Sequence, residues 1–122
     1  MSFEFYKVMH LLGLFLSLGA LAGRAYFAGN STVISADPQK KVSGAVHGTG
    51  VLLVLVGGFG MLAKMGLMAA LPGWVHAKLA LWLLVAGLIA LPYRKPSLAF
   101  GLWVALPILG ALGAYIAIYK PF

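Results

Sequence analysis

The chain has 122 residues, of which 62% are hydrophobic and only 9% are charged. This balance excludes an ordinary soluble domain, in which about a quarter of the residues are charged. The nine basic residues outnumber the two acidic ones, but they are scattered between apolar segments, so we expect contact with anionic lipid headgroups and no nucleic-acid binding. The absence of cysteine excludes disulfides, thiolate metal sites and covalently attached c-type haem.

Long apolar segments make up most of the chain. A bilayer core is crossed by about 20 largely apolar helical residues, and segments of this kind recur four times. We therefore predict an all-α integral membrane protein in which residues 1–122 form one domain. Because the second and third turns are short, consecutive helices should be antiparallel, in an up-down-up-down bundle. The four transmembrane helices are predicted over about 5–27, 38–64, 73–92 and 97–119.

The first predicted helix carries a histidine one turn from its start, His10. Lys7 precedes an apolar run and Ala20-Leu21-Ala22 resembles a cleavage site, as in a signal peptide, but we expect the segment to be retained as a helix. Gly13/Ser17 and Gly19/Gly23 are small residues four apart, a spacing that lets a neighbouring helix approach closely.

The second predicted helix opens at Asp37-Pro38, a helix N-cap followed by proline at the first helical position. His47 lies near its start, between Gly44 and Gly48. A structural role that packs His47 against another helix is favoured, and a second cofactor site or a proton relay are the alternatives. Met65 shares a helix face with two further methionines and could ligate copper or haem, although packing or lipid contact is the favoured interpretation.

The third predicted helix begins at Gly73 and carries His76 and Lys78 within its first two turns. Ionisable groups at that depth in a membrane are costly and indicate function or specific pairing. Helices 1 and 3 enter from the same side, so His10 and His76 should lie at a similar depth and both can face the interior. Two imidazoles from different helices are the usual axial ligands of b-type haem. We therefore expect haem b between them, with Lys7 and Lys78 near its propionates.

Short motifs in three of the four helices carry a family resemblance. Trp74-Val75-His76-Ala77-Lys78-Leu79 resembles the His-x-Lys opening of the third helix in HemJ-type protoporphyrinogen oxidases, and Lys120-Pro121-Phe122 is similar to the Lys-Pro-Phe ending of such proteins. His10 after Lys7, with Arg24 at the far end of the helix, resembles that family's first helix, and the wider group includes CopD-like and SirB-like membrane proteins.

This resemblance implies a four-helix membrane protein with b-type haem, which passes electrons from a porphyrin substrate to a membrane acceptor such as a quinone. The residues that it carries over are His10, His76 and Lys78. The chain departs from the family at Val104-Ala105, where an Asn-Glu pair is typical. Two other functions stay open: a non-enzymatic membrane scaffold or small transporter whose histidines only connect helices, and a copper-handling membrane protein of CopD type.

The turn charges favour an orientation in the membrane, which we expect to be a bacterial inner membrane. The basic residues of one side slightly outnumber those of the other, which places both termini on the non-cytoplasmic side by the positive-inside rule. The basic residues on the two sides are Arg24, Lys40, Lys41, Arg94 and Lys95 against Lys7, Lys64, Lys78 and Lys120.

The oligomeric state is open, with a homo-oligomer as the alternative to a monomer.

Overall fold

A computed structural model describes residues 1–31 and 36–122. All the secondary structure in these ranges is helical. The long helices are α1 (Phe3–Asn30), α2 (Lys40–Lys64), α3 (Gly73–Gly87) and α5 (Ala99–Tyr119), and three short helical turns join α3 to α5. These are η2 (Leu88–Ala90), α4 (Leu91–Arg94) and η3 (Pro96–Leu98).

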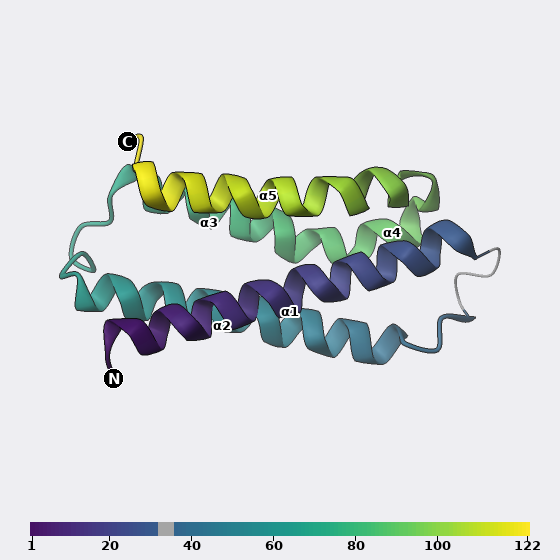
Figure 1. Cartoon of the computed structure of the whole chain (residues 1–122), viewed down its shortest axis with the longest axis horizontal. Helices are drawn as coiled ribbons and strands as arrows, with labels where there is room; N and C mark the ends of the chain where they lie inside the picture. The colour runs from purple at the N-terminus through teal and green to yellow at the C-terminus, as the bar shows by residue number, and fades with distance from the viewer. Residues whose placement is uncertain (32–35) are drawn as a thin grey trace.

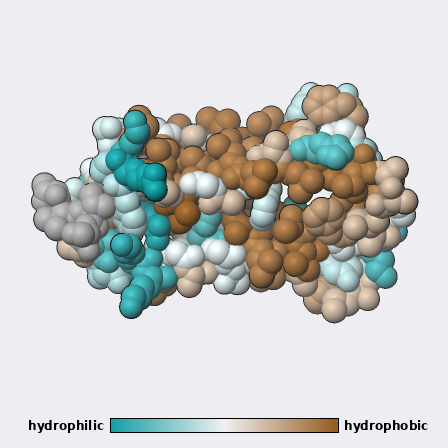
Figure 2. Space-filling view, turned by 180° about the vertical axis from the view of Figure 1, so that it is seen from behind, coloured by the Kyte–Doolittle hydropathy of each residue, from teal (hydrophilic) through white to brown (hydrophobic). Residues whose placement is uncertain are grey.

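Four helical spans of the described chain are long and apolar enough to cross a membrane, which confirms the predicted fold class. The third span continues through η2 and α4 to Arg94, and the fourth begins with η3 at Pro96. Figure 2 shows the apolar surface over the middle of the molecule and hydrophilic groups gathered towards its ends. Within a bilayer every backbone polar group must be bonded internally, and continuous helices satisfy that requirement.

The start of α2 differs from the prediction. The helix begins at Lys40, with Gln39 as its N-cap, and Pro38 lies in the preceding turn. The reason is that Asp37 caps this turn: its Oδ1 accepts a hydrogen bond from the Gln39 N–H at 2.8 Å, and its carbonyl accepts one from the Lys40 N–H at 3.3 Å. The other end of α2 leads to Gly66, whose φ of +73° is the left-handed conformation that favours glycine.

The helices form two antiparallel pairs, α1 with α2 and α3 with α5, and both chain termini lie at the same end (Figure 1). The main apolar core lies towards the opposite end, where the α1–α2 connection and α4 are found. Towards the end with the termini the two pairs diverge in Figure 1, and Figure 2 shows an opening between the two halves there. The core residues are Leu21, Ala25, Ala28, Val85, Ala99, Leu102 and Leu106.

Glycines bring α1 and α2 into backbone contact. A Cβ atom added to Gly50 would lie 2.6 Å from the backbone nitrogen of Ser17, and one added to Gly57 would lie 2.7 Å from that of His10. Gly13 faces Gly50 in the same way, so the predicted Gly13/Ser17 pair does lie at a close helix contact. The predicted Gly19/Gly23 pair does not, since a Cβ at either position would meet no atom within 4 Å.

Candidate functional site

His10 is held between α1 and α2 by a hydrogen bond to the α2 backbone. Its Nδ1 lies 2.7 Å from the carbonyl oxygen of Val54, and the side chain is half-buried. A carbonyl can only accept, so Nδ1 carries the proton and Nε2 keeps its lone pair. Gly58 lies beside the ring, where a Cβ would be in ordinary van der Waals contact with Nδ1 and Cε1 at 3.5 Å. A histidine that binds a metal through Nε2 usually donates its Nδ1–H to a carbonyl in this way.

Lys78 is the ionisable side chain that α3 turns towards His10. It is half-buried, and its ammonium is close enough to the His10 ring and to Lys120 for electrostatic interaction. The Lys120 ammonium in turn lies 5.3 Å from the centre of the Trp74 ring. These cations therefore gather at the end of the bundle where the two helix pairs diverge.

His76 does not take the inward orientation that we expected. Its side chain is exposed on α3, about 200° around the helix axis from Lys78. Because Lys78 occupies the face directed at His10, the two imidazoles do not face one another within the chain. Lys7 is also exposed, and so is Met65, which lies one residue beyond α2.

His47 is the most buried of the three histidines, with 3% of its surface exposed. Its Nε2 lies 3.1 Å from the carbonyl oxygen of Val85 and joins α2 to α3. Trp82 makes a comparable bond from α3 back to α2, its Nε1–H donating to the Val51 carbonyl at 2.8 Å. Within the described ranges, no three or more His, Asp or Glu side chains are grouped so that they could hold a metal ion.

Arg24 forms a buried polar centre: of the two orientations open to it, an interfacial anchor and an inward one towards the polar loop, the structure has the inward one. It is 8% exposed and reaches three other segments of the chain. Its Nε and Nη2 donate to Ser43 Oγ at 3.1 and 2.8 Å, Nη2 also donates to the Lys40 carbonyl at 2.9 Å, and Nη1 donates to the Ile89 carbonyl at 3.1 Å. Its guanidinium carbon lies 4.4 Å from the centre of the Tyr93 ring, a cation–π distance.

Tyr93 connects this cation to the nearest acid. The Tyr93 hydroxyl donates a short hydrogen bond to Oδ2 of Asp37, which is itself buried. The buried guanidinium and the buried carboxylate are thus joined through one aromatic side chain. The sequence carries one signal for this centre. Arg24 lies more than a turn before the end of an apolar helix, and the next helix has a serine, Ser43, in its first turn.

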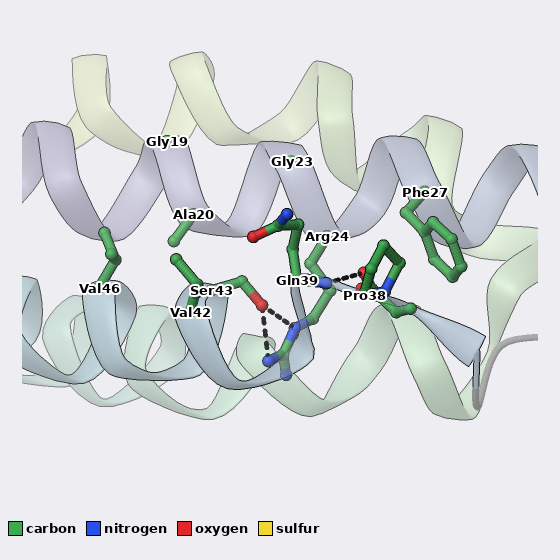
Figure 3. A pocket seen from close by; sticks show the side chains of 11 residues that line it. Gly19, Ala20, Gly23, Arg24, Phe27, Pro38, Gln39, Val42, Ser43 and Val46 are labelled. Carbon is green, nitrogen blue, oxygen red and sulfur yellow. Dashed lines mark hydrogen bonds between the residues drawn. The ribbon is translucent and has the colours of Figure 1, made fainter.

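A pocket of about 480 Å³ opens between α1 and α2 beside Arg24. Its outer rim is polar, and its deeper wall is formed by small and apolar residues of both helices (Figure 3). The lining residues are Gly19, Ala20, Gly23, Arg24, Phe27, Asp37, Pro38, Gln39, Val42, Ser43 and Val46.

Comparison with known proteins returns no match, whether to family models, to curated proteins or to solved structures. The functional assignment therefore depends on the residues themselves.

Proposed function

We propose that this chain is a small integral membrane protein that binds haem b through Nε2 of His10. The observation that carries the proposal is the bond from Nδ1 of His10 to the Val54 carbonyl, because it fixes the tautomer in which Nε2 can bind iron. The opening between the helix pairs supports it, since it lies towards the end with the termini, the half of α1 that carries His10 (Figure 2).

Bound haem would supply one-electron redox chemistry, and the surrounding residues would orient it. The Val54 carbonyl makes the imidazole a stronger donor to the metal. Lys78 carries positive charge near His10 that could pair with a propionate, and Lys120 lies near Lys78. His76, being exposed, does not fit as the second ligand from the same chain, so the predicted pair of axial histidines is reduced to His10 in this proposal.

The resemblance to HemJ-type oxidases extends the proposal to a reaction. We propose that the protein oxidises a porphyrinogen and passes the electrons to a membrane quinone, with both termini on the non-cytoplasmic side of a bacterial inner membrane. Anaerobic membranes that contain the protein should convert porphyrinogen to fluorescent porphyrin only when quinone is added. Reporter fusions to the two ends would test the orientation.

The competing function is a scaffold in which histidines only connect helices. The bond from His47 to Val85 favours it, because it has the same form as the bond from His10 to Val54 and lies in a fully packed region. A carbonyl bond alone therefore does not separate a ligand histidine from a structural one.

Haem titration of the detergent-purified protein separates the two functions. We expect a Soret band that shifts on reduction, that is lost in His10→Gly and that returns when imidazole is added to that variant. His10→Asn keeps a donor for the Val54 carbonyl but offers iron no imidazole, so it should fold normally and bind no haem. His47→Ala and His76→Ala are the matched controls and should keep the band. A wild-type protein that stays colourless after haem addition would exclude the haem function and leave the scaffold.

A further inference from the structure

The pocket beside Arg24 lies apart from His10, and its lining changes in character along its length. Its lining on α1 extends from Phe27 to Gly19, about 12 Å along the helix axis. One end carries Gln39 and Pro38, and the other carries Gly19, Ala20 and Val46 (Figure 3). A polar rim above an apolar wall matches an amphiphile with its headgroup at the membrane surface and a chain directed into the bilayer.

Two glycines make the inner part of the pocket. Gly19 and Gly23 are both exposed, and a Cβ added to either would meet no atom within 4 Å. They therefore leave an open furrow on α1 instead of contacting α2. Val42 and Val46 form the facing wall on α2, so an acyl chain in the furrow would contact side chains from both helices.

Basic residues lie at the polar end of the pocket and next to it in the chain. Lys40 and Lys41 are exposed directly after the lining residue Gln39, and Arg24 is buried in the wall with hydrogen bonds that all go to uncharged oxygen atoms. The one acid in the lining, Asp37, is already bound by the Tyr93 hydroxyl and the Gln39 N–H. The α2 N-cap, Gln39, makes no side-chain bond to the helix start, which adds to the positive potential there.

We propose that this pocket binds one anionic phospholipid, with an acyl chain along Gly19 and Gly23 and the headgroup phosphate beside Gln39, Lys40 and Lys41. The site is independent of haem, since none of its lining residues contacts His10 or Lys78. The charge on the rim selects anionic over zwitterionic headgroups, and the furrow selects a lipid over free phosphate.

Native mass spectrometry of the detergent-purified protein tests the proposal with dioleoyl phosphatidylglycerol and dioleoyl phosphatidylcholine. We expect the anionic lipid to bind about 25-fold more tightly, since each of the two nearby lysines contributes a factor of about five. Lys40→Gln and Lys41→Gln should each lower binding of the anionic lipid by about five-fold and leave the zwitterionic lipid unchanged. Inorganic phosphate should not displace the lipid. Equal binding of both lipids, or displacement by phosphate, would overturn the proposal.

Gly19→Leu tests the furrow, because the leucine side chain enters the space that the acyl chain requires. Gly48→Leu is the matched control: Gly48 is also exposed on a membrane helix with open space at its Cβ, but it does not line the pocket. We expect Gly19→Leu to abolish binding of the anionic lipid at this site and Gly48→Leu to keep it, and equal behaviour of the two variants would refute the site.

A second measurement on the unaltered protein avoids dependence on any variant that fails to fold. Phosphatidylglycerol with a diazirine in its acyl chain should crosslink to residues 19–27 of α1 and 39–46 of α2. Crosslinks distributed evenly over the other helices would contradict the proposed position.

Discussion

Substitution of Gly50 by alanine tests the close packing of α1 and α2. The added Cβ would lie 2.6 Å from the Ser17 nitrogen and 2.7 Å from the Gly13 oxygen, both of them backbone atoms that cannot rotate away. Ordinary contact begins near 3.4 Å, so the two helices must separate by about 0.8 Å. Overpacking of this kind costs about 1–3 kcal/mol.

Gly48→Ala is the control, because it makes the same chemical change two residues away, where a Cβ meets nothing within 4 Å. Both variants gain the same helix propensity, about 1 kcal/mol, so the difference between them isolates the overpacking. Unfolding by sodium dodecyl sulfate in mixed micelles, followed by circular dichroism, should give Gly50→Ala a free energy of unfolding about 1–3 kcal/mol below that of Gly48→Ala. Equal unfolding free energies would refute the close contact.

The same separation should reach the proposed haem site. The bond between His10 and the Val54 carbonyl is 2.7 Å long and spans the same two helices. A shift of about 0.8 Å brings it to the limit at which a hydrogen bond is still effective. If haem binds as proposed, Gly50→Ala should therefore weaken haem affinity while Gly48→Ala does not.

Two further substitutions test the polar contacts between helices. Arg24→Lys loses the planar donor group that reaches Ser43, Lys40 and Ile89 together, so the unfolding free energy should fall by about 3 kcal/mol, whereas Arg94→Lys on the exposed turn should leave it unchanged. His47→Leu removes the bond to Val85 and should lower the unfolding free energy by about 1 kcal/mol relative to His76→Leu. The same micelle assay measures both substitutions. Unfolding free energies equal to those of the controls would contradict these assignments.

The four-span architecture could be predicted from the sequence because it depends on segment length and apolar content alone. The orientation of a side chain around a helix could not. In a soluble helix the polar residues mark the exposed face, so the opposite face is recognised as the buried one. Lipid and protein interior are equally apolar, so the sequence of α3 offers little to distinguish the face of Lys78 from that of His76. The prediction that His76 faces inward rested on its depth in the membrane and not on its orientation around the axis of α3. The sequence determines only the depth.

The glycine pairs show the same limit. Gly13/Ser17 and Gly19/Gly23 have identical spacing, yet only the first contacts α2. The difference depends on how α1 and α2 lie against each other near Gly50, a relation between residues far apart in sequence. The hydrogen-bond partners of Arg24 could not be predicted for a similar reason, since Ile89 lies 65 positions away and its backbone carbonyl has no sequence signature.

The two ends of the bundle are built for different roles. At the end with the α1–α2 connection, the apolar core and the Arg24 centre join all the spans, so the helices there have little freedom to separate. At the other end, α1 is joined to α2 by glycine contacts and α3 to the chain end by the bond from the Trp74 N–H to the Phe122 carbonyl, at 3.1 Å. Each helix pair is thus secured internally while the pairs diverge from one another (Figure 1). The bonds from His47 to Val85 and from Trp82 to Val51 connect the two pairs further along the bundle, so a planar cofactor that enters between the pairs has to lie between these bonds and the end with the termini.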